Sequence, residues 1–125
     1  MQWSRSNEAH TGDDVANQFQ QAMRLMRSHD PQTQEDGFHQ LRPQVAQHLD
    51  ELITEFNHET AHGLRCWLLE LIGEAQSEQA LPVLIEHLHG DNESLRSWAV
   101  RGLELLDTKP ARRQLYQARA TGLIP

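Results

Sequence analysis

A short run of residues in the middle of the chain has the spacing of a zinc-hydrolase motif. His58, Glu59 and His62 form the pattern His-Glu-x-x-His. On a helix, the two imidazoles would share one face and could hold Zn²⁺, while the glutamate could activate a metal-bound water. However, Phe56 ends one apolar stripe, and Gly63 directly follows the motif. This context predicts a polar turn between two helices and no metal site, with a metal on His58 and His62 as the alternative.

Three further residues could do chemistry, and each has a structural interpretation that we favour. Cys66 is the only cysteine, lies in an apolar stripe and has no Cys-x-x-Cys partner, so we expect a partly buried structural thiol. Arg65 and Arg96 stand near the start of two helical segments, where we expect them to bridge neighbouring helical hairpins rather than bind a ligand. The seven glycines are scattered and form no phosphate-binding loop. We therefore predict that the chain is not an enzyme and takes no cofactor.

The elements that position these residues are predicted to be helices. Apolar residues recur at spacings of three and four along most of the chain, in stripes over 45–56, 64–72, 80–88, 95–106 and 111–118. Residues 1–12 are polar and expected to fray, and Asp13 is expected to cap a helix that runs to about Ser28. Asp30 and Pro31 suit the cap and first turn of the next helix. The following helix is expected to run from Pro43 to about Phe56.

The second half of the sequence repeats after 31 residues. The repeat aligns Leu64 with Leu95, Arg65 with Arg96, Trp67 with Trp98, Ala80 with Ala111, and Leu84 with Leu115. Each period holds two helices, and a single helical hairpin cannot cover its own apolar face, so we expect the hairpins to stack. We expect Trp67 and Trp98 to fill the space between hairpins and to be largely buried.

The segments 64–73 and 80–88 resemble a HEAT-like repeat of the short kind also found in phycobilin lyases, and the segment 95–103 resembles it again. The resemblance covers 64–119, while 31–56 look like a degenerate first unit. It implies an all-α fold, a short right-handed α-solenoid of about six to seven helices in stacked antiparallel hairpins. The single domain would comprise an N-terminal helix with the degenerate repeat (13–56) and two repeats (60–89 and 91–121). Such repeats imply binding to another protein, with a lyase-like enzyme as the alternative.

Charge is distributed unevenly along the chain, whose formal net charge is −7. Residues 50–93 contain ten acidic side chains and one basic one, Arg65, whereas residues 94–125 contain six basic and two acidic side chains. A net negative charge argues against nucleic acid as a partner, because that affinity comes from neutralising phosphates. The acidic block can instead steer a positively charged protein.

Length and cysteine content set further limits. A chain of 125 residues has room for one ordinary domain. No window approaches the roughly 18 apolar residues that a membrane span requires, so we expect no membrane partner. A single cysteine without a secretory segment suggests a reducing compartment, and we expect the cytoplasm.

These observations favour a non-catalytic module that binds another protein, one with a basic surface. It could be an inhibitor or immunity-type protein that neutralises a toxin, and a scaffold, an adaptor or a small enzyme are the alternatives. We expect a monomer that binds through the exposed surface of the second helices. The residues predicted to lie together there are Asp50, Glu51, Glu55, Glu86, His87, Arg112, Arg113 and Tyr116.

Overall fold

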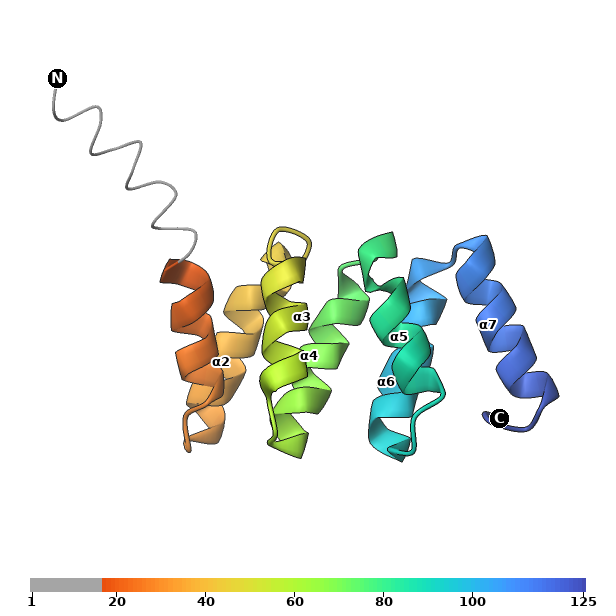
Figure 1. Cartoon of the computed structure of the whole chain (residues 1–125). Helices are drawn as coiled ribbons and strands as arrows, with labels where there is room; N and C mark the ends of the chain where they lie inside the picture. The colour runs from red at the N-terminus through yellow and green to blue at the C-terminus, as the bar shows by residue number, and fades with distance from the viewer. Residues whose placement is uncertain (1–16) are drawn as a thin grey trace, which may run out of the picture. The chain divides into compact units, whose positions relative to one another are not determined.

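The computed structural model describes residues 17–125 and is all-α over that range (Figure 1). The predicted all-α class, with about seven helices, is confirmed. Residues 17–26 are helical, and no strand occurs among the described residues. The predictions of a frayed 1–12 and a cap at Asp13 concern residues outside this range. The remaining elements are α2 (Pro31–Leu41), η1 (Arg42–Gln44), α3 (Leu49–His58), α4 (His62–Glu74), η2 (Glu78–Ala80), α5 (Leu81–Leu88), α6 (Glu93–Leu106) and α7 (Lys109–Ala120).

The chain divides into two compact units, the first ending at Pro43 and the second beginning at Gln44. This division falls within the segment 13–56, for which the sequence predicts an N-terminal helix and a degenerate repeat.

In the first unit, the helical residues 17–26 pack closely against α2. A Cβ atom placed on Gly37 would lie 2.6 Å from the carbonyl oxygen of Ala22. The start of α2 is the one predicted: Asp30 is the N-cap, and Pro31 takes the first helical position. The hydroxyl and the backbone N–H of Thr33 both donate to Asp30, which lowers the pKa of its carboxyl.

The helix before the His-Glu-x-x-His motif is shorter than predicted. The apolar pattern favours a helix from Pro43, but α3 begins only at Leu49. Residues 42–44 form a 3₁₀ turn, and the N–H groups of Gln47 and His48 donate three residues back, to Gln44 and Val45. These tighter bonds interrupt an α-helical ladder, so the predicted start is wrong.

In the second unit, α6 is the central helix, in contact with α4, α5 and α7, and α3 packs on α4. In Figure 1, α3 and α5 lie in front of α4 and α6. The core between these helices is made of large apolar side chains that are almost fully buried: Leu52, Phe56, Leu68, Leu69, Leu71, Ile72, Leu84, Leu88 and Leu103.

Helices α4 and α6 meet backbone to backbone. A Cβ atom on Gly73 would lie 2.9 Å from the Cα atom of Gly102, and one on Gly102 would lie 3.1 Å from the Cα atom of Gly73. The Cβ on Gly102 would also lie 2.7 Å from a methyl carbon of Leu84. Two glycines thus allow a helix contact that any larger residue would push apart.

Trp67 and Trp98 keep only a minor part of their surface exposed, in agreement with the prediction that they are largely buried, although neither belongs to the fully buried core. Where α4 and α6 approach so closely, smaller side chains fill the interior, among them Leu68 and Ala99. The two indoles are larger and keep part of their surface in water.

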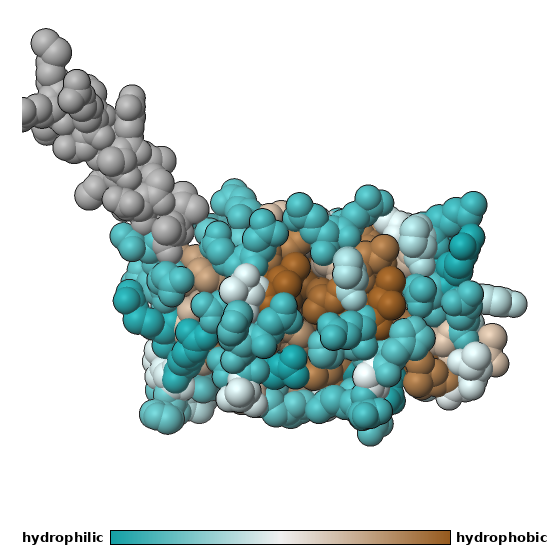
Figure 2. Space-filling view, in the orientation of Figure 1, coloured by the Kyte–Doolittle hydropathy of each residue, from teal (hydrophilic) through white to brown (hydrophobic). Residues whose placement is uncertain are grey.

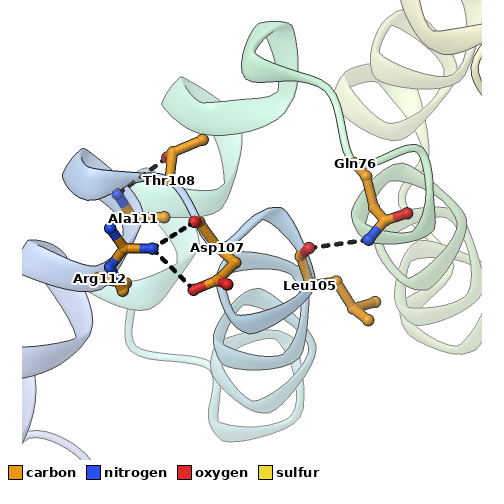
Figure 3. Close-up of polar contacts among 6 residues, drawn as sticks. All are labelled: Gln76, Leu105, Asp107, Thr108, Ala111 and Arg112. Carbon is orange, nitrogen blue, oxygen red and sulfur yellow. Dashed lines mark hydrogen bonds and ion pairs between the residues drawn. The ribbon is translucent and has the colours of Figure 1, made fainter.

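The 31-residue repeat is also visible in the backbone. Gln76 and Asp107, which are 31 residues apart, follow α4 and α6 and both adopt left-handed φ angles of 51° and 52°. The two residues make different hydrogen bonds (Figure 3). The side-chain amide of Gln76 donates to the carbonyl oxygen of Leu105 at 2.9 Å. Asp107 instead accepts from Arg112, both at its backbone carbonyl (2.7 Å) and at its carboxylate (3.1 Å). Gln76 therefore links the end of α4 to α6, whereas Asp107 links the end of α6 to α7.

Candidate protein-interaction surface

Helices α3 and α5 carry the predicted acidic residues on one side of the second unit. Asp50 and Glu51 lie exposed in the first turn of α3, where carboxylates complement the positive end of the helix dipole. Glu86 is exposed on α5, and Glu55 on α3 is half-buried. The structure thus brings the acidic members of the predicted set onto two neighbouring helices (Figure 1).

Glu78 is a member of this surface that the sequence analysis did not single out. It is exposed in η2, and η2 contacts α3. The sequence feature that could have located Glu78 is Ser77, a residue type that caps helices. Its hydroxyl accepts from the N–H of Gln79 and so starts the turn in which Glu78 is the first residue. We refer to Asp50, Glu51, Glu78 and Glu86 as the acidic surface.

Phe56 ties α3, α4 and α5 together beneath the acidic surface. Its ring is fully buried, and the ring of His87 meets it edge-on with a centroid distance of 4.9 Å. The guanidinium of Arg65 lies 4.3 Å from the centre of the Phe56 ring, and its Nε donates to the Phe56 carbonyl at 3.4 Å. Because one ring contacts side chains from the two neighbouring helices, α3 and α5 are held at a fixed separation.

The same interaction uses the only basic side chain in the acidic block. Arg65 is half-buried, with its charge directed at the Phe56 ring and carbonyl. It is therefore not available at the surface to neutralise the exposed carboxylates. Arg96, its repeat equivalent, donates to the Gly90 carbonyl at 2.7 Å. Arg65 thus joins α4 to α3, and Arg96 joins α6 to the turn that follows α5.

His87 belongs mainly to the cluster around Phe56 and contributes little to the exposed surface. It is half-buried against Phe56, with its Nε2 3.8 Å from a carboxylate oxygen of Glu86. Burial lowers the pKa of His87; Glu86 partly opposes this effect, and Arg65 reinforces it. The neutral imidazole is therefore the form that the folded chain favours.

This pKa predicts a pH dependence of stability. As the pH falls below the ordinary histidine pKa of 6.5, the unfolded chain binds a proton that the folded chain does not yet bind. The free energy of unfolding therefore decreases as the pH decreases. Relative to a His87→Gln variant, the wild-type chain is expected to lose more unfolding free energy between about pH 7.5 and about pH 5. Urea unfolding midpoints measured across this range check the slope. Parallel pH profiles for the two proteins would contradict the assignment.

The basic members of the predicted set lie elsewhere. Arg112, Arg113 and Tyr116 are exposed on α7, which packs on α6 at the opposite end of the second unit from α3 (Figure 1). One contact links α7 to the end of α5, between His89 Nε2 and the amide oxygen of Gln114 at 3.3 Å. The predicted set thus separates into an acidic group on α3 and α5 and a basic group on α7.

The zinc-like motif lies in the predicted turn. His58 is the last residue of α3 and bonds through Nδ1 to the Thr54 carbonyl at 2.8 Å, while His62 is the first residue of α4. His62 Nε2 lies 3.6 Å from the sulfur of Cys66. Over residues 17–125, no three His, Cys, Asp or Glu side chains are grouped so that they could hold a metal ion. Burial raises the pKa of the half-buried Cys66 thiol, although Arg65 opposes this, so the thiol stays protonated at neutral pH.

Apolar side chains accompany the acidic surface. Figure 2 shows them in brown between hydrophilic side chains, on the face where Figure 1 draws α3 and α5. Ile53 on α3 and Ile85 on α5 are both half-buried. A surface with partly exposed apolar groups and a charged surround has the make-up of a protein–protein interface.

Comparison with family models, curated proteins and solved structures gives no match to this chain. Within the described part, no helix has the length and apolar character needed to cross a membrane.

Proposed function

We propose that the chain is a non-catalytic, HEAT-like protein-interaction module whose acidic surface binds a basic partner protein. The observation that carries this proposal is the position of Arg65. Because the only basic side chain of residues 50–93 is directed at Phe56, no lysine or arginine of that block neutralises the exposed carboxylates of α3, η2 and α5. Uncompensated surface charge of one sign steers a partner of the opposite sign and favours its correct orientation.

A fixed arrangement of α3 and α5 supports the same proposal. The contacts of Phe56 with Arg65 and His87 order the two helices before any partner arrives. A preformed surface loses little conformational entropy on binding, and this favours affinity. In the proposed solenoid, the second helices of successive hairpins would present this surface.

We propose an inhibitor or immunity-type role, in which the chain works as a monomer in the cytoplasm and covers a basic toxin. A small acidic domain suits this task because its carboxylates complement the cationic surface of such a toxin. Scaffold and adaptor roles would use the same surface, and the identity of the captured partner distinguishes among them.

Charge reversal tests the proposal. Glu78→Lys with Glu86→Lys is expected to weaken binding of a basic partner by about tenfold, because two attractive contacts become repulsive. These positions are preferable to Glu51, which bonds to the buried His48 at 2.9 Å and whose replacement would disturb the fold. The partner is first purified from the native host on the wild-type chain, and its dissociation constant is then measured at two salt concentrations.

The matched control is Glu35→Lys with Asp36→Lys, which changes the net charge equally at two exposed positions of α2. It should bind the partner as the wild type does. A partner whose affinity is the same for both double variants, or falls equally in both, would contradict a site on the acidic surface.

A further inference from the structure

One face of α7 carries three side chains that are suited to binding. Lys109, Arg113 and Tyr116 follow one another at spacings of four and three residues and so lie along one side of the helix. Each residue of the buried side of α7 comes two positions after one of these three, which places it about 200° around the helix axis. The buried side consists of Ala111, Leu115 and Ala118. Lys109, Arg113 and Tyr116, which we call the α7 stripe, therefore face away from the core.

Tyr116 is the feature of the α7 stripe that most needs an explanation. Its relative exposure is 74%, and no other large apolar side chain among the described residues is exposed to this degree. Exposed tyrosines beside arginines recur as the anchors of protein interfaces, because the ring supplies contact area at low entropic cost.

The charges of the α7 stripe are not neutralised within the described chain. The nearby Arg112 pairs with Asp107 at 3.1 Å, and Arg119 lies 3.7 Å from Glu104. By contrast, the side chains of Lys109 and Arg113 make no hydrogen bond or ion pair with any residue of 17–125. Two free cations thus flank an exposed aromatic ring on one helix face.

We propose that the α7 stripe is a second interaction surface, which binds an acidic segment of a partner protein. Lys109 and Arg113 would pair with carboxylates, and Tyr116 would pack against an apolar side chain between them. A polyanionic nucleic acid fits less well, since its affinity requires many phosphate contacts and the chain as a whole carries a charge of −7. The proposal concerns a surface of opposite charge to the acidic surface and does not depend on it.

A peptide selection tests this inference. Random 16-residue peptides displayed on phage are selected on the immobilised full chain, and each enriched clone is then measured against three variants. The variants are Tyr116→Ala, the pair Lys109→Gln with Arg113→Gln, and Arg101→Gln, an exposed arginine of α6 that serves as control. We expect a class of acidic peptides that loses at least about tenfold in affinity with either α7 variant and nothing with the control. All three side chains are exposed, so thermal unfolding monitored by circular dichroism should be unchanged.

Two results would overturn the proposal. One is that no enriched peptide depends on Tyr116, or that those that do are not acidic. The other is that a 20-nucleotide oligouridylate binds more tightly than any such peptide and depends on the same residues. Peptides that are basic and sensitive to Glu78→Lys with Glu86→Lys would report on the acidic surface instead, so the two proposals stand or fall separately.

Discussion

Replacing Phe56 with alanine is expected to lower the free energy of unfolding by about 3 to 5 kcal/mol. The ring is fully buried at the junction of three helices, so its removal leaves a cavity and withdraws the contact surface of Arg65 and His87. A loss of this size is a large part of the stability of an ordinary domain, about 5 to 15 kcal/mol. Urea unfolding followed by circular dichroism measures it.

Phe56→Leu is the matched control for the aromatic contacts. Leucine keeps most of the volume but offers no π face to Arg65 and no edge-on partner to His87, and we expect a cost of about 1 to 1.5 kcal/mol. If alanine costs no more than leucine, the ring does not fill the junction, and the proposed role of Phe56 in ordering the acidic surface is wrong.

Gly73→Ala is expected to destabilise the chain by about 2 to 3 kcal/mol. The new methyl group would lie 2.9 Å from the Cα atom of Gly102, and a backbone atom cannot rotate away as a side chain can. The helices α4 and α6 must therefore separate, which loosens the apolar contacts along their length. The shift of the urea midpoint at an unchanged m-value gives the magnitude.

Gly63→Ala provides the control for helix propensity. Gly63 lies in the first turn of the same helix, and a Cβ atom there would meet nothing within 4 Å. Alanine at this position should stabilise α4 by about 0.5 kcal/mol, because it restricts the unfolded chain. Opposite signs for the two glycine variants are the diagnostic outcome, and a neutral Gly73→Ala would mean that α4 and α6 are not in backbone contact.

The sequence predicted elements where local chemistry decides the structure. Side chains of Asp30, Asn92 and Thr108 cap α2, α6 and α7 as their residue types suggest, and the His-Glu-x-x-His segment lies in a turn because apolar stripes end on either side of it. The acidic character of 50–93 was likewise readable without a structure. Each of these features depends on residues that are close in the sequence.

What the sequence did not reveal depends on residues that are distant in the chain. Gly73 and Gly102 each look like ordinary helix glycines, and the sequence does not show that they bring the backbones of α4 and α6 into contact. The orientation of Arg65 toward Phe56 decides whether the acidic block is neutralised, and no spacing rule gives that orientation. The same holds for α7, whose basic residues were expected beside the acidic ones.

The α7 stripe has a practical consequence for how the protein is handled. Lys109 is the only lysine in the sequence and is exposed. Reagents that modify primary amines, such as succinimidyl esters, therefore have one side-chain target, and it lies two turns from Tyr116 on the same helix face. A dye attached there would sit within the stripe, and a sensor chip or resin coupled through amines would hide it. Immobilisation through another group keeps this face open.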